Sequence, residues 1–133
     1  MRFVSIKYVP LTLLLIYSVA SSAMKNSDKD VRAGERIYAQ CSGCHAPDYN
    51  RTGPKHCGIS GRPAGGVKNF NYTEAMKNSG VVWTRESLNR FLKSPFKMIP
   101  GTSMGFSGIA SEKERKQLIT YMIQLNENNF LCR

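Results

Sequence analysis

The five residues Cys41-Ser42-Gly43-Cys44-His45 form a C-x-x-C-H motif, the spacing typical of covalent attachment of a c-type haem. Two thiols at this spacing can reach the two vinyl groups on one edge of a porphyrin. The histidine that follows can then bind the iron through an imidazole nitrogen. The motif therefore predicts one haem c, attached through Cys41 and Cys44, with His45 as the proximal ligand.

Other uses of a cysteine pair fit the sequence less well. A redox pair would be expected after a strand in a βαβ pattern, and a zinc site would need two further ligands nearby. Neither context surrounds Cys41 and Cys44. A structural thiol or zinc protein is therefore the weaker alternative, and an absorption spectrum would test it.

The sixth position on the iron separates an electron carrier from a catalyst or sensor, which would need an open or labile site. The candidate ligand is Met104, because residues 100–106 combine Pro and Gly in a way that predicts a tight, irregular loop. Such a loop can present a thioether inward, whereas Met122 lies on a helical stripe and is expected to fill the core. Met98, in the same loop, is the second candidate, and Met76 falls in a polar loop segment.

The N-terminus has the pattern of a secretory signal. Arg2 and Lys7 precede an apolar run over residues 8–20, which ends on the small residues 21–23. We expect a signal peptide over residues 1–23, cleaved after Ala23, and one domain over residues 24–133. The apolar run is short for a membrane span of about 20 residues, so an uncleaved anchor is the lesser alternative. Export suits both haem attachment and disulfide formation, and in a bacterium the compartment would be the periplasm.

The chain is strongly basic, with 19 Lys and Arg against 9 Asp and Glu in 133 residues. Only Arg2 and Lys7 lie in the predicted signal, so the mature part keeps 17 basic and 9 acidic residues, a formal net charge of +8. Such a domain favours a nucleic acid, an anionic membrane or an acidic protein as partner. The basic residues are scattered and no nucleic-acid-binding motif is present, so we expect no nucleic acid and favour an acidic protein.

Three helical patterns are expected to position these residues. Residues 30–41 carry Gly34, Ile37, Tyr38 and Cys41 on one face of a helix that runs into the haem motif. Gly34 costs about 1 kcal/mol relative to Ala in a helix interior, so a close helix crossing is a reasonable cause.

The other two helices lie in the C-terminal half, after a loop predicted over residues 46–71. Thr84 can cap a helix that carries Leu88, Phe91 and Leu92 and ends at Ser94-Pro95. Ser111 and Glu114 fit a capping box, and the helix after it carries Leu118, Tyr121, Met122 and Leu125. These patterns predict an all-α domain with long loops, for which a haem would supply apolar bulk.

Taken together, these residues resemble the soluble class I cytochromes c, close to the mitochondrial and alphaproteobacterial type. The resemblance extends from Gly34 to about Asn126. It rests on the C-x-x-C-H motif and on the following segments: 34–38, Thr52-Gly53-Pro54, Gly61-Arg62, 69–73, 81–84 and 94–106.

The resemblance implies a fold of three main helices and long loops wrapped around one covalent haem c, and one-electron transfer as the function. It implies Met104 as the sixth ligand and the Pro54 carbonyl as the group that holds the proximal histidine. Arg62, Tyr72 and Trp83 would donate hydrogen bonds to the haem propionates, for which their side chains are suited.

Some positions depart from the family pattern. Phe91 replaces a family tyrosine on the methionine side, and His56 replaces a leucine that packs against haem; its ring could bond the loop backbone or, rarely, compete for iron. Several lysines that would surround the exposed haem edge are replaced, at Gln40, Phe96, Ser103 and Ala110, whereas Lys97 and Arg51 keep basic positions. The face expected to dock with partners therefore carries fewer basic side chains than the family pattern.

Two cysteines, Cys57 and Cys132, are left over from the haem motif, and an even pair in an exported protein suggests a disulfide. The resemblance places Cys57 near the end of the C-terminal helix, so the pairing is geometrically reasonable. Closing about 75 residues would contribute roughly 4 kcal/mol in the chain-entropy model. Two free thiols, or an intermolecular bridge through Cys132, are the alternatives.

The resulting hypothesis is a monomeric periplasmic electron carrier that associates peripherally with membrane complexes, not an enzyme. By resemblance its donor would be a quinol–cytochrome c reductase and its acceptor a terminal oxidase, in a respiratory or photosynthetic chain. A dedicated electron acceptor for a periplasmic dehydrogenase is the first alternative. A haem peroxidase or ligand sensor is the second, from a different functional class.

Overall fold

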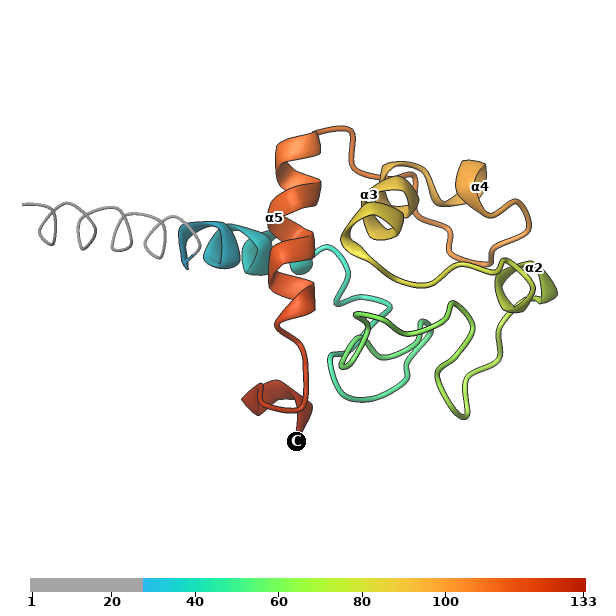
Figure 1. The fold of residues 1–133 in the computed structure, drawn as a ribbon, viewed down its shortest axis with the longest axis horizontal. Helices are drawn as coiled ribbons and strands as arrows, with labels where there is room; N and C mark the ends of the chain where they lie inside the picture. The colour runs from blue at the N-terminus through green and yellow to red at the C-terminus, as the bar shows by residue number, and fades with distance from the viewer. Residues whose placement is uncertain (1–27) are drawn as a thin grey trace, which may run out of the picture.

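The computed structural model describes residues 28–133, so the predicted signal segment lies outside the described residues. A helix covers residues 28–38 and is followed by α2 (Glu74–Lys77), α3 (Arg85–Lys93), α4 (Pro95–Met98), α5 (Glu112–Ile123) and the 3₁₀ helix η1 (Phe130–Cys132) (Figure 1). Across residues 28–133 no strand forms, and extended pairing is limited to one isolated bridge between Pro63 and Val82. The all-α prediction is confirmed.

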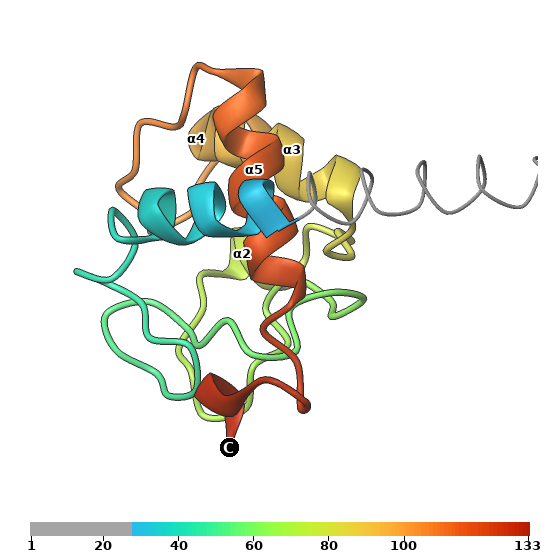
Figure 2. The ribbon, with the colours of Figure 1, turned by 90° about the vertical axis from the view of Figure 1, so that its left-hand side faces the viewer.

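The helix over residues 28–38 crosses α5 at a steep angle (Figures 1 and 2). Gly34 lies at the crossing, where a Cβ atom would come within 2.7 Å of the Gln117 carbonyl carbon and 2.8 Å of the Tyr121 Cβ. The close crossing predicted from this glycine is therefore present. Any side chain at Gly34 would force the two helices apart.

This helix is shorter than the sequence pattern suggested, because the prediction that it continues through Cys41 is wrong. Residues 39–44 form turns, in which the Cys41 N–H donates to the Tyr38 carbonyl (2.8 Å) and the Cys44 N–H to the Cys41 carbonyl (3.1 Å). These bonds span three residues rather than four, so the chain tightens at the motif. The His45 N–H then donates to the Cys41 carbonyl (2.9 Å), which places the histidine over the same turn.

The helix predicted after Thr84 is present as α3. Its N-terminus has a full capping box, in which Thr84 Oγ1 accepts from the Ser87 N–H (3.2 Å) and the Ser87 hydroxyl accepts from the Thr84 N–H (2.7 Å). Ser94 ends α3, and Pro95 occupies the first turn of α4, where its missing N–H costs no helical bond. α3 packs against both α4 and α5.

The predicted capping box of α5 is only half formed. Ser111 Oγ accepts from the Glu114 N–H (3.3 Å), but within residues 28–133 no return bond joins the Glu114 side chain to Ser111. The helix itself has the expected apolar stripe, with Leu118, Tyr121 and Met122 all buried, whereas Leu125, also buried, lies just beyond the end of α5.

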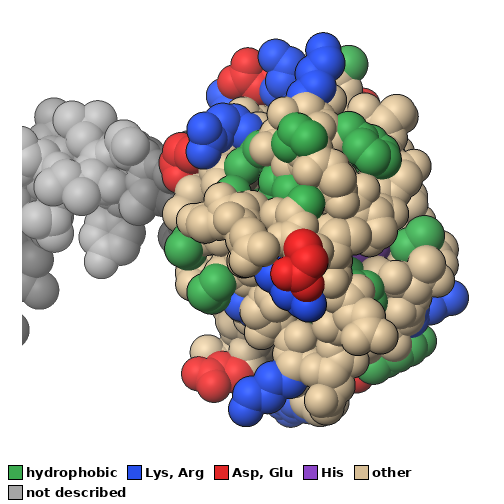
Figure 3. All heavy atoms as spheres, turned by 90° about the vertical axis from the view of Figure 1, so that its right-hand side faces the viewer, with side chains coloured by type: hydrophobic (Ala, Val, Ile, Leu, Met, Phe, Trp, Pro, Cys, Tyr) green, Lys and Arg blue, Asp and Glu red, His purple; other side chains and the backbone are tan. Residues whose placement is uncertain are grey.

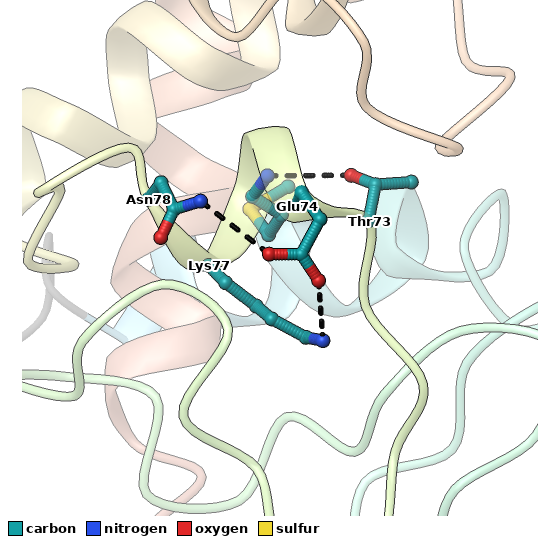
Figure 4. Close-up of polar contacts among 5 residues, drawn as sticks. Thr73, Glu74, Lys77 and Asn78 are labelled. Carbon is teal, nitrogen blue, oxygen red and sulfur yellow. Dashed lines mark hydrogen bonds and ion pairs between the residues drawn. The ribbon is translucent and has the colours of Figure 1, made fainter.

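The segment around Met76 is a four-residue helix, α2, rather than the polar loop predicted from its composition. Thr73 caps it by accepting from the Met76 N–H (3.3 Å), and Glu74 binds Lys77 (2.8 Å) and Asn78 (3.4 Å) on the exposed side (Figure 4). With its polar neighbours turned to solvent, Met76 is buried in the core. The polar composition concealed an inward-facing thioether.

The long loop over residues 46–71 has no helix or strand, as predicted. It lies against the chain that follows α5 (Figure 2), where the Gly58 N–H donates to the Leu125 carbonyl (2.7 Å). A disulfide joins Cys57 in this loop to Cys132 in the C-terminal tail, with the two Cα atoms 5.6 Å apart. Within residues 28–133 no helix is both long and apolar enough to cross a membrane.

Candidate functional site

A cavity of about 300 Å³ lies between the turn after the first helix, the loops and the buried face of α3. Its wall brings together all seven residues that the sequence predicted for haem binding: Cys41, Cys44, His45, Arg62, Tyr72, Trp83 and Met104. They come from five segments that span more than sixty positions of the chain. Most of the remaining wall is apolar and includes Leu88, Phe91 and Phe106.

His45 is fixed at one ring nitrogen and free at the other. Its Nδ1–H donates to the Pro54 carbonyl (2.7 Å), as the family resemblance implied, so Nε2 is left without a proton and can bind a metal. Burial lowers the pKa of His45, which favours this neutral form, and the Pro54 hydrogen bond opposes the shift. Gly53 lies against the ring, where a Cβ atom would come within 2.6 Å of both ring nitrogens.

The two motif cysteines lie at the edge of the cavity beside this imidazole. Cys44 is exposed and Cys41 is half-buried, and neither forms a disulfide. Burial raises the pKa of the Cys41 thiol to about 11, and the neighbouring Cys44 adds to the shift. Before any modification Cys41 is therefore a neutral thiol facing an apolar cavity, available for addition to an unsaturated group.

Met104 is one of three methionines in the cavity wall, together with Met76 and Met122. It is the only one of the three that lies in a loop, and its N–H donates to Thr102 Oγ1 (3.3 Å). Met98, the second sequence candidate, packs against the core but does not contribute to this cavity wall. Sequence reasoning missed Met76, and the available signal was Thr73, a capping residue three positions before it.

Three polar side chains of the wall are the predicted propionate donors, Arg62, Tyr72 and Trp83. Arg62 donates to the carbonyls of Cys57 (2.8 Å) and Lys55 (2.9 Å), which leaves further guanidinium protons for an anionic group. The Trp83 ring packs on Phe91 with centroids 5.0 Å apart, and its indole N–H has no hydrogen-bond partner within residues 28–133. Burial raises the pKa of Tyr72, so its hydroxyl stays protonated and able to donate.

His56 also lines the cavity, and its contacts differ from the sequence prediction. Its ring bonds to a side chain, not to the loop backbone: Nδ1 and the Tyr38 hydroxyl are joined by a hydrogen bond of 2.9 Å. The ring is 7% exposed and stacks on the His45 ring, with centroids 4.2 Å apart and planes 21° from parallel. Burial lowers the pKa of His56 well below its ordinary value, and nearby His45 and Arg62 lower it further. The ring is therefore neutral.

The comparisons agree with this geometry. The family model for cytochrome c matches residues 31–126. Cytochrome c2 from Agrobacterium tumefaciens is 44% identical over 100 residues, covering 71% of this chain and 90% of the relative. Cytochrome c2 from Blastochloris viridis is 35% identical over 114 residues, covering 84% and 90%. The solved structure of cytochrome cH from Methylobacterium extorquens superposes with a TM-score of 0.69 at 36% identity, covering 71% of this chain and 97% of that one.

The chain belongs to the cytochrome c family.

As a class I cytochrome c, it carries one covalently attached haem c and acts as an electron carrier rather than an enzyme. The donor set fits this group on chemical grounds: two thiols at the rim, a free imidazole nitrogen, a loop thioether and unsatisfied N–H donors surround one apolar cavity. Family membership also argues against the alternatives of a structural thiol protein or a zinc protein.

Proposed function

We propose that this cytochrome c carries single electrons between a membrane-bound donor complex and an acceptor, with the haem attached at Cys41 and Cys44. His45 and Met104 would bind the haem iron, and Arg62, Tyr72 and Trp83 would hold the propionates. The observation that carries the proposal is the convergence of these seven side chains on one cavity. When bound, the haem supplies the one-electron ferric–ferrous couple.

The protein side chains set how this couple behaves. The thioether of Met104 is a soft ligand and favours ferrous iron, which raises the reduction potential relative to two histidines. The Pro54 carbonyl fixes the tautomer and orientation of His45. The apolar wall keeps water away from the iron, and the donors of Arg62, Tyr72 and Trp83 compensate the charge of buried carboxylates.

We place this carrier in the periplasm, as a monomer exported with the signal over residues 1–23 and processed after Ala23. The relatives named cytochrome c2 and cytochrome cH support this setting, as does the disulfide between Cys57 and Cys132, which requires an oxidising compartment. N-terminal sequencing of the purified protein tests the processing. A first residue other than Met24 would contradict the assigned cleavage site.

The surface chemistry of the protein, as well as its family, supports a proposal for its redox partners. The face that carries α2 and α4 shows hydrophobic side chains among uncharged ones, while most Lys and Arg side chains lie toward its margin (Figure 3). Phe96, on α4, is 52% exposed, and Gln40 and Ser103 contribute uncharged side chains to the cavity wall. We propose a quinol–cytochrome c reductase as donor and a terminal oxidase as acceptor, docked through a mixed apolar and basic surface.

The test is a comparison of electron-transfer rates with purified partners. Stopped-flow spectroscopy should show fast reduction by a quinol–cytochrome c reductase and fast oxidation by a terminal oxidase. Faster reduction by a periplasmic dehydrogenase than by the reductase would favour the dedicated-acceptor alternative instead. A respiratory or photosynthetic role would then follow from whichever acceptor reacts fastest.

A further inference from the structure

The two histidines of this chain lie face to face, and only one of them belongs to the haem motif. The His56 ring stacks on the His45 ring at 4.2 Å, with an angle of 21° between the planes. Gly53 also packs against the His45 ring, and Pro54 holds its Nδ1. His56 is therefore part of the enclosure that limits rotation of the His45 imidazole.

His56 is itself fixed from the helix crossing. Its Nδ1 is hydrogen-bonded to the Tyr38 hydroxyl (2.9 Å), and the two rings meet edge to face with centroids 5.5 Å apart. Tyr38 lies in the last turn of the first helix and packs on Tyr121 of α5, with ring centroids 5.1 Å apart. The backbone of His56 is held as well, because its N–H donates to the Pro47 carbonyl (3.0 Å). Neither the ring nor its backbone is free to turn away from His45.

We propose that His56 is a positioning residue, which together with Tyr38 sets the plane of the proximal His45 imidazole about its bond to the iron. This inference rests on the proposed ligation by His45 and goes beyond it. The Pro54 hydrogen bond fixes one ring nitrogen, and the stacked His56 ring fixes the direction in which the imidazole plane faces. The crossing between the first helix and α5 is thereby linked, through Tyr38 and His56, to the iron ligand.

The test uses the ferric holoprotein, in which the haem methyl resonances in proton NMR and the g-values in EPR both depend on axial-ligand orientation. Three variants are compared: His56→Leu removes the stacked ring, Tyr38→Phe removes only the hydroxyl that holds it, and Tyr121→Phe removes a neighbouring hydroxyl that bonds neither histidine. We expect His56→Leu to change the order or spread of the haem methyl shifts, Tyr38→Phe to change them in the same direction by less, and Tyr121→Phe to leave them unchanged.

The outcomes are separable from the proposed function. Axial ligation by His45 is judged on the unsubstituted protein, whose ferric spectrum must show a low-spin haem with one imidazole and one thioether ligand. If that spectrum is present and both His56→Leu and Tyr38→Phe keep the native methyl shifts and g-values, the positioning role is wrong even if the variants unfold more easily. Tyr38→Phe keeps the size and shape of the ring, so this comparison survives if His56→Leu fails to fold.

Discussion

The two loops that face the haem cavity are built differently, and the first is bonded along much of its length. In this proximal loop, residues 46–62, the Pro54 carbonyl holds His45 at 2.7 Å. The Cys57 carbonyl accepts a hydrogen bond from the Arg62 guanidinium (2.8 Å), and the Cys57 side chain forms a disulfide with Cys132. The loop is therefore tied to its own cavity wall and to the C-terminal tail.

The methionine loop, residues 99–110, is held mainly at its ends. Arg115 is buried and donates to the Ile109 carbonyl (2.7 Å) at the far end. At its start, the Thr102 N–H donates to the Ile99 carbonyl (3.1 Å), and across residues 103–108 the only hydrogen bond within the described part of the chain joins the Met104 N–H to Thr102 Oγ1 at 3.3 Å. A segment with so few backbone bonds opens at a low free-energy cost. If His45 and Met104 bind the iron as proposed, we expect the histidine side to be the more rigid and ligand exchange to begin on the methionine side.

Replacement of Met104 is expected to have the largest effect, and it tests the difference between the two loops directly. Met104→Ala should abolish the red charge-transfer band of thioether–iron coordination in the ferric protein and convert slow carbon monoxide binding by the ferrous protein into fast binding. Met98→Ala is the matched control and should change neither. If the band survives Met104→Ala or disappears in Met98→Ala, the ligand assignment is wrong. Rapid carbon monoxide binding by the native protein would favour a sensor or peroxidase.

Removal of the disulfide tests what holds the proximal loop. Cys132→Ser should lower the free energy of unfolding by about 4 kcal/mol, as expected for closure of a loop of 75 residues. Denaturant titration measures this loss, and the visible spectrum should change little because the bond lies away from the iron. Mass spectrometry of the alkylated, non-reduced protein provides the control. Labelling of both Cys57 and Cys132 in the native protein would refute the bridge.

A pair of glycines, one in each loop, sharpens the comparison. An Ala at Gly53 would press its Cβ against the His45 ring, whereas a Cβ at Gly105 would meet no atom of the described chain within 4 Å apart from its own neighbours in sequence. We expect Gly53→Ala to cost about 1–3 kcal/mol of stability and to shift the haem spectrum. Gly105→Ala should stay within about 0.5 kcal/mol of the native protein. Equal losses in thermal unfolding would show that the two loops are equally confined.

The smallest expected effect concerns the surface around the methionine loop. Encounter with an acidic partner depends on charges at the contact face, which are screened over about 8 Å at physiological salt. The double variant Phe96→Lys, Ser103→Lys should show an electron-transfer rate that falls more steeply with ionic strength. At low salt, its rate of electron transfer to an acidic oxidase should rise by up to about tenfold. If the native protein already shows the steep dependence in stopped-flow assays, Lys97, Arg51 and their neighbours suffice for electrostatic docking, and the interpretation of a weakened basic face is wrong.

Local spacing alone predicted part of the site, whereas Arg62, Tyr72 and Trp83 were implied only by the family resemblance. The C-x-x-C-H motif places three groups within one turn, and the glycine in the first helix marked a crossing that the structure contains. Thr84 marked the start of α3 in the same way. Such features depend on neighbours a few residues apart, and these can be read directly from the sequence.

The features that escaped prediction depend on longer separations or on very short elements. The bond between Tyr38 and His56 joins residues 18 positions apart and depends on how the loop folds back under the helix. α2 has only four residues, too few to show a helical period, so the burial of Met76 was hidden. The first helix stops at residue 38 because the motif turns replace its last turn, which apolar spacing alone does not indicate.

The disulfide described above has a consequence for how the protein is made. Cys57 and its partner at position 132 are 75 residues apart, whereas Cys57 lies close in sequence to Cys41 and Cys44. If the chain is exported from its N-terminus as proposed, these three thiols emerge long before the last one. Biogenesis would then have to keep Cys41 and Cys44 reduced for thioether formation and hold Cys57 unpaired until the C-terminus arrives. A premature bridge between Cys57 and Cys41 or Cys44 would block cofactor attachment, so a thiol reductant should be needed to reopen any such bridge before the haem is attached.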